Sequence, residues 1–234
     1  MIQLAIFDMD GTLLDTIEDL GNATNVALKE TGHRSDFTIE EMNAFYGSGL
    51  RCAIRRALRR EEGATLDELL LDDSTEDGIY KDEIDRILTV YNDYYPSHCH
   101  IRTAPYAGIP EAIRSIREMG ILTAVVSNKN DEPLRILTEE YFPGLFEAAV
   151  GVRPELRRKP YPDLTFKVME ELQVAPEHAI YVGDTEIDIM TAANAGIPCI
   201  SVDWGFRTRA FLEEKGASVI CRTPEEMVRR MKEF

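Results

Sequence analysis

Short runs of apolar residues alternate with longer amphipathic segments over most of the chain. The apolar runs, each the length of a buried strand, lie at residues 4–7, 121–126, 148–150, 179–182, 199–202 and 218–220. Amphipathic segments that predict helices lie at residues 108–119, 133–141, 162–172 and 187–195 and from residue 224 onward. Strands that alternate with helices at this spacing predict an α/β fold with a doubly wound parallel sheet.

Residues 16–95 follow a different pattern. Apolar residues recur there at helical spacing, for example at Leu20, Leu50 and Ile84, and almost no run is typical of a strand. An acidic loop is expected near residues 72–77. We therefore predict an α-helical cap domain (16–95) inserted into one discontinuous α/β core (1–15 and 96–234).

The charge of the chain restricts its partners. The formal net charge is −16, which argues against nucleic acid, because binding phosphodiesters requires a basic surface. The arginine run at residues 55–60 could bind an anion, but with Glu61 and Glu62 beside it the run is more typical of a solvated helical face.

The chain also carries no sign of a membrane or export signal. No stretch reaches the roughly 18–20 apolar residues that a membrane helix needs, and the N-terminal residues lack the basic region of a signal peptide. The four cysteines are widely spaced, which is typical of reduced core thiols. We expect a cytoplasmic protein.

Polar residues gather where the predicted strands end. They are Asp8 and Asp10 after the first strand, Ser127-Asn128-Lys129 after the second, Gly183-Asp184 with Asp188 after a later one, and Lys159 before a helix. In an open parallel sheet, ligands bind outside the carboxyl ends of the strands. These groups are therefore expected to meet in one site.

Three carboxylates in that set predict a magnesium site. Asp8 and Asp10, two residues apart, would repel each other without a cation or a proton between them, and Asp184 adds a third carboxylate. Such a set suits an octahedral Mg²⁺, and without a histidine or thiol it does not suit zinc. Gly11 allows a sharp turn, after which the amides of Gly11 and Thr12 could surround phosphate oxygens.

The sequence resembles the haloacid dehalogenase superfamily. The resemblance rests on four segments in the family's order, which are Asp8-Met9-Asp10-Gly11-Thr12, Ser127-Asn128, Lys159-Pro160 and Gly183-Asp184-Thr185-Glu186-Ile187-Asp188. The helical insert is similar to the cap of subfamily I. Residues 105–112, 203–206 and 224–227 look like those of phosphoglycolate phosphatases.

The resemblance implies a reaction and a role for each motif residue. Asp8 would be the nucleophile and form an aspartyl phosphate, and Asp10 would act as general acid and base. Ser127 and the Asn128 amide would bind phosphoryl oxygens, and Lys159 would neutralise charge. Mg²⁺ would be held by Asp8, the Asp10 carbonyl and Asp184, with Asp188 in an outer shell.

Substrate specificity is expected from the cap, where Arg51 follows the Gly47-Ser48-Gly49 turn and could meet a substrate carboxylate. The alternative is an ordinary turn between two helices that leaves Arg51 in solvent. The leading interpretation is a phosphatase of a small phosphomonoester, with 2-phosphoglycolate as the best single candidate. One alternative is a hexose phosphomutase, which would return the phosphoryl group to a sugar. Another is a receiver-like protein that is phosphorylated on Asp8 without being an enzyme.

Overall fold

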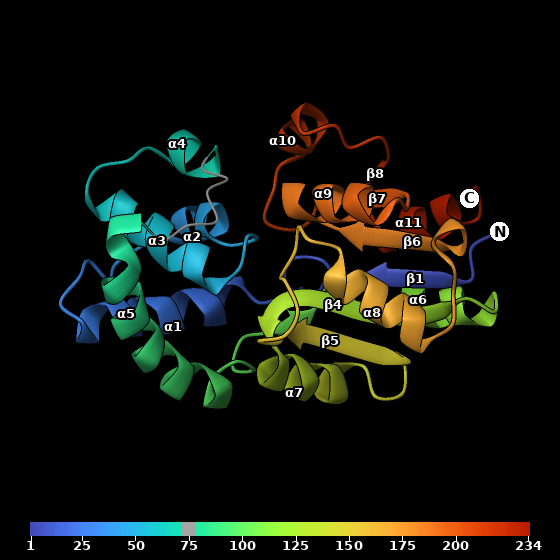
Figure 1. Ribbon diagram of the computed structural model, residues 1–234. Helices are drawn as coiled ribbons and strands as arrows, with labels where there is room; N and C mark the ends of the chain where they lie inside the picture. Colours follow the sequence, from blue (N-terminus) through green and yellow to red (C-terminus); the bar gives the residue numbers. More distant parts are fainter. Residues whose placement is uncertain (72–77) are drawn as a thin grey trace. The chain divides into compact units, whose positions relative to one another are not determined.

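The chain folds into two compact units. The computed structural model describes residues 1–71 and 78–234, so the expected acidic loop at 72–77 lies outside the described residues. One unit combines Met1–Asp15 with Ala104–Phe234, and the other is Thr16–Thr103 (Figure 1). These units divide the chain after residue 15 and before residue 104. The domain boundaries expected from the sequence, at residues 16 and 96, stay predictions.

The first unit contains a six-stranded parallel sheet. Its strands are β1 (Leu4–Phe7), β4 (Leu122–Asn130), β5 (Ala148–Val152), β6 (Ala179–Gly183), β7 (Cys199–Val202) and β8 (Ile220–Cys221). They lie in the order β5-β4-β1-β6-β7-β8, and every pairing is parallel. The predicted doubly wound sheet is therefore confirmed. The chain extends the sheet to one side of β1 and then returns to the other side, and such a switch point is where ligands bind.

Helices cover both faces of this sheet. They are α6 (Ile109–Glu118), α7 (Asp131–Tyr141), α8 (Asp163–Glu171), α9 (Glu186–Ala195), α10 (Arg209–Glu214) and α11 (Pro224–Met231). Helix α8 contacts β4 and β5, and α9 contacts β6 and β7. The sequence analysis missed α10 and the short antiparallel pair β2 (Leu14–Asp15) and β3 (Ala104–Pro105), because elements this short carry no readable periodicity.

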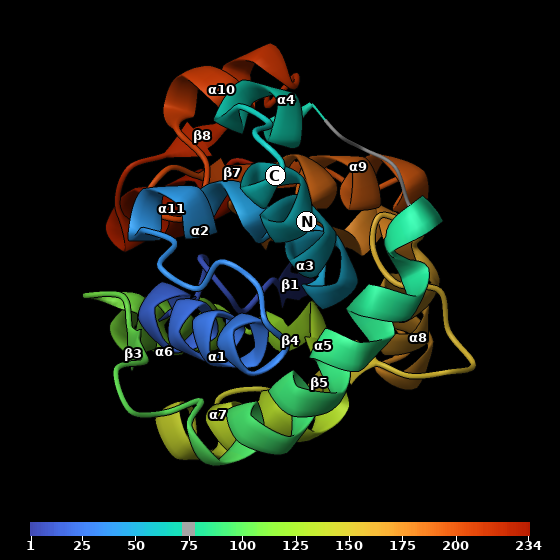
Figure 2. The same cartoon turned by 90° about the vertical axis from the view of Figure 1, so that its left-hand side faces the viewer.

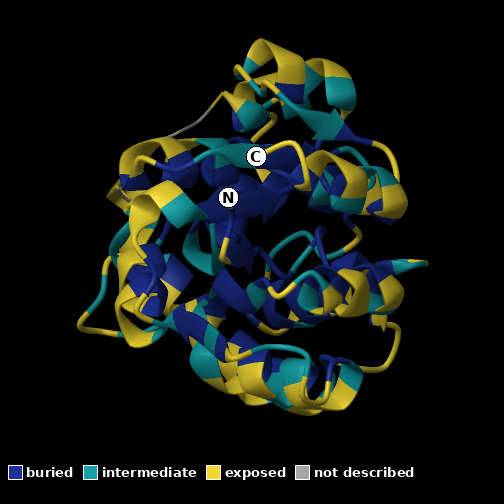
Figure 3. Cartoon of the chain, turned by 90° about the vertical axis from the view of Figure 1, so that its right-hand side faces the viewer, coloured by how far each residue is buried: buried dark blue, intermediate teal, exposed yellow. Residues whose placement is uncertain are grey.

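Strand β1 is buried on both faces. Leu4 and Ile6 belong to a core cluster that also contains Leu164 and Val168 of α8. Phe7, which points to the opposite face, meets Phe146 edge to face at a centroid distance of 6.1 Å. The buried colour accordingly fills the middle of the α/β unit, whereas the outer helix surfaces are exposed (Figure 3). The residue that follows β1 thus starts from a rigid, fully packed base.

The second unit is helical, as its spacing predicts. Its helices are α1 (Ile17–Glu30), α2 (Ile39–Phe45), α3 (Leu50–Glu61), α4 (Leu66–Leu70) and α5 (Lys81–Tyr94). Helix α1 contacts α2 and α5, and α3 contacts the same two helices (Figure 2). None of the described helices is both long and apolar enough to cross a membrane.

Residues 96–103 are tied to helix α1, which explains the later boundary. The buried carboxylate of Asp19 accepts hydrogen bonds from the backbone N–H groups of Arg102 and Thr103, each at 2.8 Å, and from the Thr103 hydroxyl at 2.9 Å. Composition does not reveal this connection, because Asp19 and Thr103 lie 84 residues apart in the sequence.

The arginine run is only partly a solvated face. Arg55 and Arg56 are 3% and 1% exposed, so that interpretation is wrong for these two residues. Arg56 Nη1 donates to the carbonyl oxygens of Ala44 and Phe45 at 3.2 and 3.0 Å. Arg56 therefore binds carbonyl groups at the end of α2, which have no partner within the helix.

A histidine in the helical unit lies between two carboxylates. His33 Nδ1 is 2.8 Å from Glu61 Oε2, and its Nε2 is 2.6 Å from Glu83 Oε1. Both ring nitrogens can donate only when the imidazole is protonated. Burial alone would lower the pKa of His33, but the hydrogen bonds to Glu83 and Glu61 outweigh it and raise the pKa. His33 thereby connects α3 to α5.

Replacement of His33 by Gln should lower stability in a pH-dependent way. Because the pKa of His33 is raised on folding, its contribution is complete below the unfolded value of about 6.5 and is lost as the pH rises through the folded value. Denaturant unfolding should therefore show a larger difference between wild type and His33→Gln at about pH 5.5 than at about pH 9. His100→Gln, at an exposed position, is the control. A difference that does not change with pH would contradict the assignment.

Candidate active site

Three neighbouring strands carry the predicted site residues to one edge of the sheet. Asp8 follows β1, Asp184 follows β6, and Ser127 lies near the carboxyl end of β4. Because β4, β1 and β6 are adjacent and parallel, their carboxyl ends lie together. The carboxylate oxygens of Asp8, Asp184 and Asp188 can lie within 4.8 Å of one another. These three acids, predicted at the strand ends, therefore lie together at this edge.

The loop after β1 closes on itself. The carbonyl oxygen of Met9 accepts hydrogen bonds from the backbone N–H groups of Thr12, Leu13 and Leu14. Gly11 has φ of +84°, a left-handed conformation that favours glycine. Asp8 is 5% exposed, and Oδ1 of its carboxylate accepts a hydrogen bond from Met9 N. The loop therefore fixes Asp8 at the point where the strand ends.

Asp184 is held from both sides. Its Oδ1 accepts the Thr12 hydroxyl at 2.8 Å, and its Oδ2 accepts the backbone N–H of Phe206, also at 2.8 Å. A Cβ at Gly11 or Gly205 would lie 2.3 Å from Asp184 Oδ2, so glycine is required where these loops close on the carboxylate.

A tryptophan in the 203–206 loop holds the Asp8 loop as well. Trp204 Nε1 donates to the carbonyl oxygen of Thr12 at 3.0 Å. The sequence analysis noted this loop for its resemblance to phosphatases but gave it no role. The loop holds Thr12 through the Trp204 side chain and Asp184 through the Phe206 N–H.

Lys159 connects two of the acids. Its Nζ is 2.9 Å from Asp8 Oδ1 and 2.8 Å from Asp188 Oδ1, and the side chain is 1% exposed. The other oxygen of Asp188 caps helix α9 by accepting from the N–H and the hydroxyl of Thr185 at 3.0 and 2.7 Å. Asp188 is thus bound through both oxygens, whereas Asp8 Oδ2 accepts no hydrogen bond from the described residues.

Burial and charge shift the pKa values in this cluster. Burial raises the pKa of Asp8 to about 7, although the positive charge of Lys159 opposes the change. Burial, with the charges of Asp188 and Asp8, also raises the pKa of Asp184 well above its usual range. Burial alone would lower the pKa of Lys159, but Asp188 and Asp8 raise it, so the ammonium form persists. Among the described residues, the positive charge beside Asp8 and Asp184 therefore does not offset the effect of their burial.

Strand β4 carries an irregularity at the site. Its residues pair with β5 in regular order up to Val126 and Val150, and the next pair is Asn130 with Val152. Three residues of β4, Ser127-Asn128-Lys129, therefore lie opposite the single residue Gly151. Bulges of this kind redirect side chains and are frequent beside active sites.

The bulge brings Lys129 to Asp10, a contact that the sequence analysis missed. Lys129 Nζ lies 2.9 Å from Asp10 Oδ1 and 3.0 Å from Oδ2. Asn128, in the same segment, joins Lys159 through a reciprocal pair of hydrogen bonds of 3.1 and 2.9 Å between its side-chain amide and the Lys159 backbone. The Asn128 side chain thus helps to place Lys159.

Comparison with known proteins assigns the chain to a family. The family model described as haloacid dehalogenase-like hydrolase matches residues 5–202. The chain belongs to this family. A phosphoglycolate phosphatase from Pseudomonas savastanoi pv. phaseolicola is 31% identical over 220 residues, which cover 93% of this chain and 76% of that protein. A phosphoglycolate phosphatase from Aquifex aeolicus is 30% identical over 206 residues, 88% and 86% of the two chains.

Solved structures agree with this assignment. The structure of a candidate phosphoglycolate phosphatase from Lactobacillus delbrueckii subsp. bulgaricus superposes with a TM-score of 0.94 at 42% identity and covers 98% of each chain. The predicted resemblance to the haloacid dehalogenase superfamily is therefore confirmed, and so is the expectation of a phosphatase-like hydrolase.

Among the described residues, the ion pairs at the site of this hydrolase balance the charge of its four carboxylates only in part. Asp8, Asp10, Asp184 and Asp188 carry four negative charges when ionised, and Lys129 and Lys159 carry two positive charges. The excess of two equals the charge of one divalent cation. Carboxylate oxygens are the ligands that Mg²⁺ prefers, so the residues present fit such an ion.

Arg51, the residue predicted to meet a substrate carboxylate, lies in the helical unit of the hydrolase at the start of α3. Its Nη1 donates to Asp85 Oδ1 of α5 at 2.7 Å, and its side chain is 34% exposed. The proposed contact with a substrate stays a prediction.

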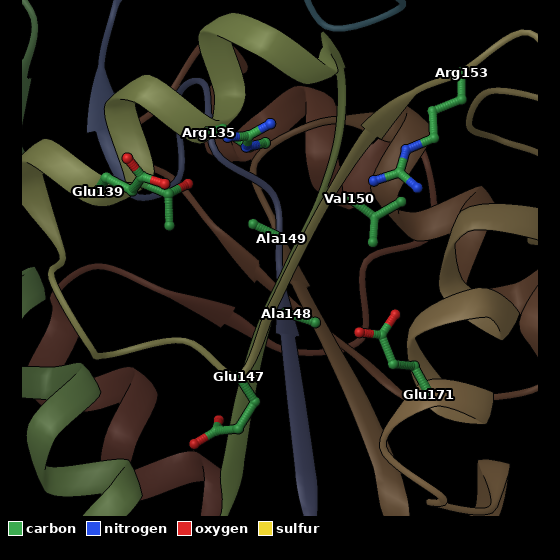
Figure 4. Close-up of a pocket in the computed structure, with 9 residues that line it drawn as sticks. Arg135, Glu139, Glu147, Ala148, Ala149, Val150, Arg153 and Glu171 are labelled. Atoms are coloured by element: carbon green, nitrogen blue, oxygen red, sulfur yellow. The ribbon is translucent and has the colours of Figure 1, made fainter.

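A hollow of about 300 Å³ lies beside the edge strand β5 of the hydrolase (Figure 4). It is lined by Arg135, Thr138, Glu139, Glu147, Ala148, Ala149, Val150, Arg153 and Glu171. Figure 4 shows charged side chains of both signs on each side of the strand. Because the hollow combines three glutamates with two arginines, it offers a phosphate no concentrated positive charge, and it contains none of the site residues named above.

Proposed function

We propose that this hydrolase is a magnesium-dependent phosphatase that removes the phosphoryl group of a small phosphomonoester through an aspartyl phosphate on Asp8. One observation carries the proposal. Asp8, held through one oxygen by Met9 N and Lys159, lies beside the carboxylates of Asp184 and Asp188 at the carboxyl end of β1. A fixed carboxylate next to positive charge is suited to attack phosphorus.

In the first step, Asp8 Oδ2 would attack the phosphorus atom in line with the ester oxygen. The new bond joins Asp8 to phosphorus while the bond from phosphorus to the ester oxygen breaks. Asp10 would donate a proton to the departing oxygen, so that an alcohol leaves. Ser127 and the amides of Gly11, Thr12 and Asn128 would bind the phosphoryl oxygens, and Lys159 would offset their charge.

In the second step, water would attack the phosphorus of the aspartyl phosphate. Asp10, now a carboxylate, would accept a proton from that water as the bond between phosphorus and Asp8 breaks. Inorganic phosphate would leave, and both aspartates would return to their starting states. The same side chain would thus serve as acid and then as base.

Magnesium would be held by the Asp8 and Asp184 carboxylates and the Asp10 carbonyl, with Asp188 outside them. When bound, the ion would offset the negative charge of the carboxylates and of the phosphoryl group. The two unbalanced negative charges at the site and the raised pKa values of Asp8 and Asp184 support this assignment.

The best single candidate for the substrate is 2-phosphoglycolate. The relatives named above, at 30% and 31% identity, are phosphoglycolate phosphatases, and this supports the choice. Arg51 could then bind the carboxylate of that substrate. Membership in a hydrolase family favours an enzyme over a receiver-like phosphate acceptor.

A screen of small phosphomonoesters with Mg²⁺ tests the proposal. We expect inorganic phosphate to be released from 2-phosphoglycolate or a similarly small ester, and Asp8→Asn to reduce release to background while thermal unfolding shows a folded protein. Asp93→Asn, an exposed aspartate in α5, is the matched control and should retain full activity.

Three results would count against the proposal. Release of phosphate by Asp8→Asn at the wild-type rate would remove Asp8 as the nucleophile. Conversion of a hexose phosphate into its isomer without release would instead support a phosphomutase. Absence of turnover on every ester would contradict phosphatase activity.

Magnesium should also stabilise the folded protein before any substrate is added. An ion that binds only the native state at about 100 times its dissociation constant adds about 2.7 kcal/mol to the free energy of unfolding. Thermal unfolding should therefore shift upward as Mg²⁺ is added to wild type and to Asp93→Asn, and the shift should be largely lost in Asp184→Asn. An equal shift in Asp184→Asn would place the ion elsewhere.

A further inference from the structure

A second buried lysine contacts the proposed acid and base. The Lys129 side chain is 3% exposed and that of Asp10 is 16% exposed, and the Lys129 ammonium group lies within 3.0 Å of both carboxylate oxygens. Lys159 forms the other buried ion pairs of the site, with Asp8 and Asp188. In these ion pairs Lys129 binds Asp10, whereas Lys159 binds Asp8 and Asp188.

The local fold brings Lys129 to this place. Lys129 lies in the bulge of β4, where three residues face Gly151. A Cβ at position 151 would lie 2.7 Å from the Lys129 carbonyl oxygen and 2.8 Å from the Asp131 Cα, both backbone atoms that cannot rotate away. The glycine therefore allows the bulge to close, and the Ser127 Oγ fixes it by accepting the Lys129 N–H at 3.2 Å.

We propose that Lys129 is a positioning residue for Asp10, and this inference rests on the acid and base role proposed above. An ammonium group bound to both carboxylate oxygens orients the ionised form of Asp10, which acts as the base. When one oxygen carries the proton that Asp10 donates as the acid, the ammonium group can keep its hydrogen bond to the other oxygen. A general acid or base works only within hydrogen-bond reach of the proton that it moves. A displacement of about 1 Å can lower the rate by about 10²-fold.

This role makes a distinct prediction about leaving groups. The alkoxide formed from an alkyl phosphate such as 2-phosphoglycolate needs a proton, whereas 4-nitrophenolate is stable without one. Loss of an interaction that acts through Asp10 should therefore slow hydrolysis of the alkyl phosphate far more than hydrolysis of 4-nitrophenyl phosphate. A purely structural defect should impair both esters equally.

The experiment measures kcat/KM for 2-phosphoglycolate and for 4-nitrophenyl phosphate in wild type, Lys129→Met, Lys129→Arg and Asp10→Asn. If the screen identifies a different aliphatic ester, that ester replaces 2-phosphoglycolate. We expect Lys129→Met to lower kcat/KM by about 10–10²-fold for the alkyl ester and by less than about threefold for the aryl ester. Lys129→Arg, which keeps the charge, should recover part of the loss. Lys167→Met, at an exposed lysine of α8, is the matched control.

The double variant Lys129→Met/Asp10→Asn decides whether the lysine acts through Asp10. If it does, kcat/KM of the double variant for the alkyl ester should be within about threefold of the value for Asp10→Asn alone. The inference would be overturned if the losses of kcat/KM in the two single variants multiplied in the double variant, or if Lys129→Met lost equally on both esters. Either result would leave the phosphatase proposal intact. Failure of the wild-type protein to hydrolyse either ester would overturn both. Thermal unfolding of Lys129→Arg identifies a folded variant if Lys129→Met does not fold.

Discussion

The structure of the site depends on the placement of Lys159 between Asp8 and Asp188. Two carboxylates in a protein interior are costly unless a positive charge and hydrogen bonds accompany them. Lys159 supplies both, at 2.9 and 2.8 Å, and the Thr185 cap binds the remaining oxygen of Asp188. The second oxygen of Asp8 accepts no hydrogen bond from the described residues and is therefore available for the proposed attack on phosphorus. Removal of Lys159 would leave buried carboxylates without compensation, so the same contact supports both folding and the proposed reaction.

Backbone features bring these groups close enough to act together. The parallel sheet places the ends of β4, β1 and β6 side by side, and this fixes the sequence segments that can contribute. Glycines then allow backbone to approach the carboxylates where a side chain would collide, as at Gly11 and Gly205 beside Asp184. Asp8 and Asp184 remain short of positive charge in this arrangement, and a divalent cation would supply it.

Much of the fold and of the candidate site could be predicted from the sequence, because both depend on the local pattern of apolar and polar residues. Alternation of apolar runs with amphipathic segments predicts the sheet, and acids at the strand ends predict the cluster of Asp8, Asp184 and Asp188. The contact of Lys129 with Asp10 could not be predicted, because it depends on a register shift against β5 and on Gly151, 22 residues further along. Burial of Arg55 and Arg56 and the later domain boundary likewise depend on packing between distant segments. Lys129 did carry one signal, since it directly follows the Ser127-Asn128 motif.

The central claim is that Asp8 becomes covalently phosphorylated. Rapid acid quenching during turnover, followed by borohydride reduction and mass spectrometry of the peptides, tests it most directly, because reduction converts an aspartyl phosphate into homoserine. We expect homoserine at position 8, formed only when substrate is present. Homoserine at another aspartate, or none while the alcohol product is released in a burst, would contradict it.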